Sequence, residues 1–274
     1  MIKLVCLYGV GDAYLVCGLV RAFEAHHGYP ARIVLKSSQA VIAEMFGVDH
    51  EVDTELVEEA ERNHDFKCGY ENVRSDGSTF YAHPHFLRSG ARIDQLTVKM
   101  PRTSQADMYR ALLGLSPWAP LEIPAGRITI EPPVDIEPGS VLIVERARSW
   151  PSPLPEFWDA FEARYGKPVR RLPADWSLAN AFGLATISEW VIGPQCGFMS
   201  VLMEAGYQCR KTLVSRELDA DAGPGPFGMT SAWPYMRAEI FAGNSHPDVD
   251  EYLVGTDPTQ WDEVIGAILH NHRN

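Results

Sequence analysis

The sequence has few cysteines, and none of them form a closely spaced pair. Among 274 residues there is no C-x-x-C motif, and the five cysteines are Cys6, Cys17, Cys68, Cys196 and Cys209. An odd number at wide spacing argues against a disulfide framework and a zinc site, and suits a reducing cytoplasm. Cys6 and Cys17 lie in apolar runs and are interpreted as small core residues.

The sequence also lacks long apolar runs and an excess of positive charge. No stretch reaches the roughly 20 apolar residues of a membrane span, and the N-terminal apolar run is too short for a signal peptide. Lys and Arg number 24 against 36 Asp and Glu, a formal net charge of −12. This balance disfavours nucleic acid, although basic residues near 146–148 and 164–171 could still form a local phosphate cleft. We expect a cytoplasmic protein without a transmembrane segment.

The first half of the chain alternates between apolar runs and amphipathic stretches. The patterns predict strands over residues 2–9, 29–38 and 48–53, and helices over 12–28, 38–47 and 104–115. Residues 62–100 are polar, aromatic and rich in turn formers, which predicts loops and short strands. Such an alternation is typical of a parallel sheet covered by helices.

A proline-rich stretch, 117–139, is interpreted as a link to a second alternation of strands and helices. We therefore predict an α/β protein with two Rossmann-type domains, residues 1–125 and 126–274. The last helix starts near Pro258 and could pack back on the N-terminal domain.

The first glycine turn, LYGVGDAYLV, lies between a predicted strand and a predicted helix. Gly9 and Gly11 permit a tight turn and close approach of a ligand. Ligands of open α/β sheets gather beyond the carboxyl ends of strands, where Asp12 is expected. Asp12 could face a substrate hydroxyl, or it could be only the N-cap of the helix.

The second glycine turn, GPQCGFMSVLMEAG, has the same arrangement in the other half of the chain. Its backbone N–H groups at Gln195, Cys196 and Gly197 could receive a diphosphate, with Ser200 one turn further on. A plain strand-to-helix turn is the alternative interpretation.

Together the two turns resemble the GT-B glycosyltransferases, and most closely the ADP-heptose lipopolysaccharide heptosyltransferase family. GVGDAYLVCGLVRAF is similar to its N-terminal glycine turn, and DMYRALLGL to its helix before the interdomain link. VLIVERARSWPSPLPEFWDAF resembles the opening of its nucleotide-binding domain, and WVIGPQCGFMSVLMEAG its donor signature D-S-G-x-x-H-x-A-x-A-x-G. Three positions depart from that signature, which has Asp, Ser or Thr, and His where this chain has Gln195, Cys196 and Ser200.

The resemblance implies two Rossmann-type domains facing across a cleft and a metal-independent glycosyltransferase that needs no cofactor. A nucleotide-diphosphate sugar would be the donor, and the acceptor a glycan, a lipid-linked sugar or a small molecule. Asp12 would be the general base, and Arg146 or Arg148 would stabilise the leaving diphosphate. The other expected substrate-binding residues are Gly9, Gly11, Tyr14, His83, His85, Arg88, Gln195, Cys196, Gly197, Phe198, Met199, Ser200 and Glu204.

Several alternatives stay open. The same fold could serve a nucleotide-sugar hydrolase or epimerase, or a degenerate, non-catalytic nucleotide-binding module. The loop pair His83 and His85 could hold a metal but lacks a visible third ligand. Cys196 could be a nucleophile at a helix N-terminus, although no histidine partner is apparent.

Overall fold

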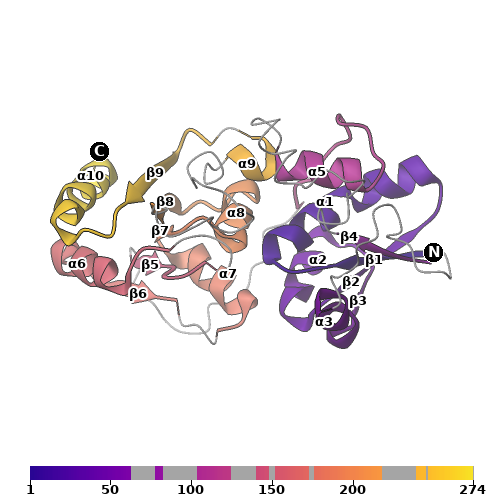
Figure 1. Ribbon diagram of the computed structural model, residues 1–274, viewed down its shortest axis with the longest axis horizontal. Helices are drawn as coiled ribbons and strands as arrows, with labels where there is room; N and C mark the ends of the chain where they lie inside the picture. The colour runs from indigo at the N-terminus through magenta and orange to yellow at the C-terminus, as the bar shows by residue number, and fades with distance from the viewer. Residues whose placement is uncertain are drawn as a thin grey trace. The chain divides into compact units, whose positions relative to one another are not determined.

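The structure is a computed structural model that describes residues 1–62, 78–82, 104–124, 140–147, 152–172, 176–217, 239–244 and 246–273. The chain divides into two compact units (Figure 1). Unit 1 comprises Met1–Ile128 and Glu239–Asn244, and unit 2 comprises Thr129–Ala238 and Ser245–Asn274.

Unit 1 is built on a parallel sheet with the strand order β3-β2-β1-β4. Its elements are β1 (Ile2–Cys6), α1 (Val10–His27), β2 (Ala31–Leu35), the 3-10 helix η1 (Ser37–Gln39), α2 (Ala40–Phe46), β3 (His50–Val52), α3 (Thr54–Arg62), β4 (Thr79–Ala82), α5 (Gln105–Leu112) and α9 (Glu239–Ala242). β1 lies within the predicted strand 2–9, and its apolar residues Leu4, Val5 and Cys6 are fully buried. β1 is central, with β2 on one side and β4 on the other, so the chain reverses its direction of winding there. This reversal is the place where open α/β sheets receive ligands.

Unit 2 is built on a second parallel sheet, with the order β6-β5-β7-β8-β9. Its elements are β5 (Val141–Ile143), α6 (Pro155–Tyr165), β6 (Val169–Arg171), α7 (Leu178–Ile187), β7 (Trp190–Gly193), α8 (Gly197–Glu204), β8 (Arg210–Arg216), β9 (Val249–Val254), the 3-10 helix η6 (Pro258–Gln260) and α10 (Trp261–Arg273). The winding reverses between β5 and β7, so the carboxyl end of β7 is the corresponding place in this sheet.

Helices cover the second sheet in two layers, with α6 and α10 packed together on one side and α7 and α8 on the other (Figure 1). The predicted apolar face of α6 is confirmed, because Phe157, Trp158 and Phe161 are fully buried. They form a core with Trp190 of β7 and Ile265 of α10. α10 is therefore part of unit 2. Trp261 and Ile265 give α10 an apolar side that the α6 core buries.

Unit 1 also contains α9, although this helix comes late in the sequence, after most of unit 2. Phe241 of α9 is 2% exposed and contacts Tyr14 of α1, with ring centroids 5.8 Å apart. Its neighbour Gly243 lies against Ser104, at the start of α5.

The first part of the expected link is also attached to unit 1. The Glu122 N–H donates to the Gly18 carbonyl at 2.9 Å, and the Arg110 guanidinium donates to the Ala119 carbonyl at 2.8 Å. A Cβ on Gly18 would lie 2.7 Å from Leu121 Cδ1, so glycine is needed for this close approach. Residues 117–122 therefore do not serve as a free connection, and residues 125–139 lie outside the described part.

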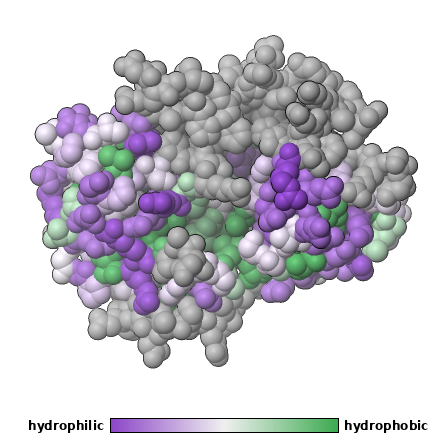
Figure 2. Space-filling view, turned by 60° about the horizontal axis from the view of Figure 1, so that its bottom comes forward, coloured by the Kyte–Doolittle hydropathy of each residue, from purple (hydrophilic) through white to green (hydrophobic). Residues whose placement is uncertain are grey.

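The surface of the described residues is mixed in character: hydrophilic and apolar side chains both reach the face shown in Figure 2. None of the helices in the described ranges is both long and apolar enough to cross a membrane.

Candidate functional site

Asp12 lies in the first turn of α1, directly beyond the carboxyl end of β1. The helix begins at Val10 with Gly9 as its N-cap, so Asp12 is the third helical residue and not the N-cap. Its Oδ2 accepts a hydrogen bond from the Gly9 N–H at 3.0 Å, which closes the turn as in a capping box. Asp12 thus stabilises the start of the helix, as the N-cap interpretation expected, but it does so from the third helical position.

The other carboxylate oxygen of Asp12 is bound from a different helix. The hydroxyl of Tyr109, in α5, donates to Asp12 Oδ1 at 2.6 Å. Tyr109 is 1% exposed and Asp12 is partly buried. Hydrogen bonds from two directions fix the orientation of the carboxylate.

The surroundings of Asp12 raise its pKa. Burial is the largest cause, and the negative charge of Glu61 adds to it, while the Tyr109 hydroxyl and the Gly9 N–H lower the pKa. The net effect is a carboxylate that is more basic than an ordinary aspartate, as general-base catalysis requires.

The residue before the turn, Tyr8, has a left-handed backbone with φ of 69°. Such a conformation costs on the order of 1–3 kcal/mol for a residue with a side chain and persists only where neighbours hold it. Here the Tyr8 N–H donates to Glu61 Oε1 at 2.5 Å, and Glu61 Oε2 pairs with Lys36 Nζ at 2.6 Å. The side chains of Lys36 and Glu61 are only 13% and 12% exposed, so this ion pair is shielded from solvent.

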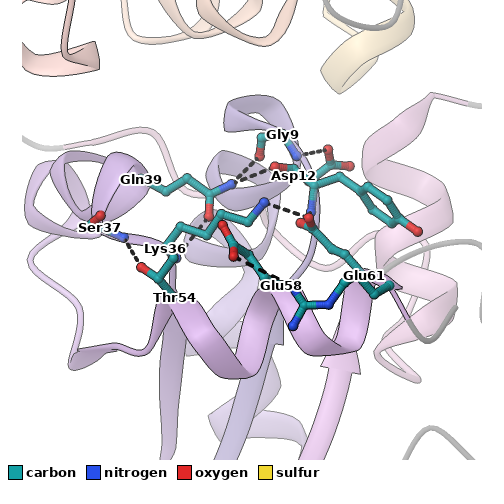
Figure 3. A network of polar contacts seen from close by, with 10 residues as sticks. Gly9, Asp12, Lys36, Ser37, Gln39, Thr54, Glu58 and Glu61 are labelled. Atoms are coloured by element: carbon teal, nitrogen blue, oxygen red, sulfur yellow. Dashed lines mark hydrogen bonds and ion pairs between the residues drawn. The ribbon is translucent and has the colours of Figure 1, made fainter.

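Gln39 holds the same turn from the side of η1. Its amide Nε2 donates to the carbonyls of Tyr8 at 3.1 Å and Gly9 at 3.0 Å. Figure 3 shows Gln39, Lys36 and Glu61 converging on Gly9 and Asp12. The polar side chains of two later elements, together with Tyr109, thus brace the first glycine turn.

The remaining predicted residues of unit 1 divide into three groups. The Gly9 N–H and carbonyl are both used inside the turn, and Gly11 is buried. Tyr14 is fully buried and packs edge-on against Phe46, so its ring is part of the core of unit 1. The predicted acceptor-side residues His83, His85 and Arg88 lie outside the described residues.

The second glycine turn lies at the carboxyl end of β7, as expected. A Cβ on Gly193 would lie 2.6 Å from both the Cβ and the carbonyl oxygen of Val144, so this turn sits tightly against the end of β5. Cys196 is the N-cap of α8, and the Gln195 N–H donates to Ser215 Oγ at 3.4 Å. The Gln195 N–H is therefore already engaged.

Most side chains of the second turn are buried. Of the substrate-binding residues predicted here, Cys196 and Gly197 are partly exposed, whereas Gln195, Phe198, Met199, Ser200 and Glu204 are buried. Phe198 packs against Phe182 with ring centroids 5.0 Å apart. The buried side chains are part of the unit 2 core, so an external ligand at this turn would meet backbone groups.

Glu204 is bound within unit 2 by a histidine. Its Oε1 lies 2.8 Å from His246 Nε2, and its side chain is 2% exposed. This pair joins the end of α8 to the residues that precede β9.

Cys196 is a poor nucleophile in this structure. Burial raises the pKa of its thiol to about 11, and the N–H groups of Met199 and Phe198 lower it only in part. Because the thiolate is the reactive form, a thiol that is protonated at neutral pH argues against the nucleophile interpretation.

Two of the basic residues considered for a phosphate cleft, Arg164 and Arg171, bind carboxylates within unit 2. The Arg171 guanidinium binds three carboxylates, those of Glu145 at 2.7 Å, Asp159 at 2.5 Å and Glu162 at 2.6 Å. Arg164 pairs with Asp262. Arg146, next to β5, is exposed and forms no ion pair with any described residue; Arg148 lies outside that set.

Sequence reasoning missed Tyr109, Glu61, Lys36 and Gln39. Tyr109 is 97 positions from Asp12, and Glu61 is 53 positions from Tyr8. No local spacing signals such pairs, although the glutamate-rich helix 54–62 could have been recognised. Within the described ranges, no group of three or more His, Cys, Asp or Glu is placed to hold a metal ion.

No protein-family profile and no curated protein sequence matches the chain. Among solved structures, the chain resembles the iron-containing dodecameric glycosyltransferase TibC of enterotoxigenic E. coli H10407 at 14% identity and a TM-score of 0.48. The match covers 78% of this chain, which spans 57% of TibC.

A second solved structure, E. coli heptosyltransferase WaaC with ADP, matches at 11% identity with a TM-score of 0.50. This match covers 99% of this chain and 98% of WaaC. At such identity the likeness concerns the fold. The chain thus has the two-unit, parallel α/β fold of a GT-B glycosyltransferase and resembles the heptosyltransferases in that fold.

Proposed function

We propose that this protein is a glycosyltransferase that moves a sugar from a nucleotide-diphosphate sugar to an acceptor hydroxyl. The observation that carries the proposal is Asp12, a carboxylate braced at the carboxyl end of the central strand β1 with its pKa raised by burial. The fold shared with WaaC, a heptosyltransferase whose structure contains ADP, supports the same chemistry.

In the proposed reaction Asp12 removes the proton of the acceptor hydroxyl. The hydroxyl oxygen attacks the anomeric carbon of the donor sugar, and the nucleoside diphosphate leaves. A carboxylate offers about four lone-pair positions, which is more than the hydrogen bonds from Tyr109 and Gly9 occupy. Glu61 is less suited to this task because Lys36 neutralises it and the Tyr8 N–H occupies its other oxygen. The proposed mechanism uses no metal ion and no other cofactor.

The donor diphosphate would rest at the β7–α8 turn. The first N–H groups of a helix lack intrahelical partners and favour anions, and Gly197 leaves the backbone approachable at this end of α8. Support also comes from the place of this turn, beside the β5–β7 reversal, and from the exposed guanidinium of Arg146 after β5.

The direct test is incubation of the protein with a panel of nucleotide-diphosphate sugars and candidate acceptor hydroxyls, followed by mass spectrometry of the products. A new glycoside together with free nucleoside diphosphate supports the proposal. Free sugar or an isomerised nucleotide sugar without transfer would indicate a hydrolase or an epimerase. Binding without turnover would indicate a non-catalytic module.

A further inference from the structure

We propose that Tyr109 is a positioning residue for Asp12, whose buried hydroxyl fixes the carboxylate and holds it in its ionised form. The inference rests on the proposed function only in so far as Asp12 is the general base of the reaction. The interaction itself is a property of unit 1 and can be measured without a substrate.

Tyr109 can act only as a donor toward Asp12. Burial, the negative charge of Asp12 and the hydrogen bond to it all raise the pKa of the Tyr109 phenol well above its usual range, so the phenol keeps its proton at neutral pH. A hydrogen bond of 2.6 Å from a neutral hydroxyl to a carboxylate is of the short, charge-assisted kind. It stabilises ionised Asp12 and offsets part of the effect of burial.

The helix that carries Tyr109 is itself fixed at both ends. Ser104 caps α5, with its Oγ accepting from the Asp107 N–H at 3.1 Å and its own N–H donating to Asp107. Arg110 links Asp107 to the Ala119 carbonyl beyond the helix. Since α5 also packs against α1, the Tyr109 hydroxyl has little freedom to move away from Asp12.

The other titratable groups near Asp12 cannot take the place of this hydroxyl. The buried thiol of Cys6 in β1 has its pKa raised well above the usual value and stays neutral. Glu61 of α3 is negative and acts in the opposite direction, raising the pKa of Asp12, while its partner Lys36 is held by Glu61. Tyr109 is the side chain that donates to the carboxylate, beside the backbone N–H groups of Gly9 and of Asp12 itself.

The experiment is a carboxyl ¹³C NMR titration of the full chain labelled at aspartate. The Asp12 resonance is identified by its absence from Asp12→Asn. In Tyr109→Phe the pKa of Asp12 is expected to rise by about one unit or more, because a hydrogen bond to a charged group is lost. Tyr165→Phe is the matched control: it removes another buried phenol, in unit 2, and leaves the Asp12 titration unchanged.

A second measurement keeps the inference testable if Tyr109→Phe does not fold. Protein made with 3-fluorotyrosine has more acidic phenols, so the bond to Asp12 strengthens and the pKa of Asp12 should fall. A pKa of Asp12 that rises in Tyr109→Phe and falls in the 3-fluorotyrosine protein supports the role. If Tyr109→Phe is unfolded, the fall in the 3-fluorotyrosine protein supports it alone. An Asp12 pKa that stays within about 0.3 unit of wild type in the folded proteins would overturn it.

The titration also separates this inference from the proposed function. If the shifts appear but no sugar transfer can be found, the glycosyltransferase proposal fails while the Tyr109–Asp12 coupling stands. If transfer depends on Asp12 but the shifts are absent, the role of Tyr109 is wrong. With an active enzyme, the acidic limb of its pH–rate profile should move to higher pH in Tyr109→Phe.

Discussion

At the residue scale, the main feature of this molecule is one carboxylate with two tasks. Asp12 closes the first turn of α1 through Gly9 and, in the proposed reaction, accepts a proton. A residue held in a setting that disfavours its charged form lowers the stability of the fold, which is a common cost of active sites. Asp12 should therefore be replaceable with a gain in stability.

The first prediction concerns the stability of Asp12→Asn against pH. Because burial raises the pKa of Asp12, the native state retains its proton above the ordinary value of 3.8, where the unfolded chain has lost it. Wild type should lose stability relative to Asp12→Asn as pH rises from there through the native pKa, by about 1.4 kcal/mol per unit of raised pKa.

Urea unfolding at a series of pH values measures this difference. Well below pH 3.8 Asp12 is protonated in the native and the unfolded state alike, so that region serves as the internal control. A stability difference that is constant with pH would contradict the raised pKa.

Prediction from sequence at this scale depends on distance along the chain. Asp12 could be found because two glycines and a preceding apolar run mark its turn. Tyr109 could not, because only the packing of α5 on α1 brings its hydroxyl to Asp12. Tyr14, which we predicted to bind substrate, has its ring in the core of unit 1; an aromatic residue at helical spacing gives the same sequence pattern whether it faces a ligand or a core.

At the element scale, the two glycine turns differ in what makes them rigid. The first is braced by polar side chains from η1, α3 and α5, whereas the second is fixed by close packing of Gly193 on Val144. A tightly packed turn should respond strongly to a single added methyl group.

The second prediction is that Gly193→Ala destabilises the protein by about 1–3 kcal/mol, since its Cβ would meet the backbone of Val144. Gly266→Ala in α10 is the matched control. Its Cβ would lie 3.4 Å from the flexible Arg164 side chain, and alanine favours a helix by up to about 1 kcal/mol. Chemical unfolding should show a lower free energy of unfolding for Gly193→Ala and a higher one for Gly266→Ala. If Gly193→Ala loses no more stability than Gly266→Ala, the packing argument is refuted.

The third prediction tests the donor side through Gly197. Gly197→Val places a branched side chain at the first residue of α8 and should weaken binding of a nucleoside diphosphate at least about tenfold, by about 1.4 kcal/mol. Cys196→Ser is the control, because a serine N-cap preserves the helix and leaves the backbone open. Calorimetry on both variants gives the dissociation constants, and equal values would remove this turn as the diphosphate site.

The elements themselves were largely predictable, because periodicity and glycine stops mark long, regular segments. The predicted parallel strands before and after the two turns, and the apolar face of α6, are confirmed. α3 and β9 were not predicted; their sequences, TELVEEAER and VDEYLV, are short and mostly polar. The place of α3 depends on its contacts with β2, and that of β9 on its pairing with β8.

At the scale of the whole molecule, the two units are not simply successive halves of the sequence. α9 belongs to unit 1 although β8 and β9 on either side of it belong to unit 2. No local pattern could have revealed this, since what fixes α9 is the packing of Phe241 against Tyr14.

The fourth prediction follows from that packing. Phe241→Ala should destabilise unit 1 by about 3–5 kcal/mol, the usual cost of removing a buried phenyl ring. Hydrogen exchange followed by mass spectrometry should show faster exchange in α1 and α5, with β5 and β7 little changed. Faster exchange confined to unit 2 would contradict the assignment of α9 to unit 1.

The most direct test of the central claim is sugar transfer by wild type and Asp12→Asn, measured side by side with the dissociation constant for the nucleoside diphosphate. If Asp12 is the base, transfer should fall by about 10²–10⁴-fold while donor binding stays the same. Wild-type transfer rates in Asp12→Asn, with the donor equally bound, would show that the reaction does not use Asp12.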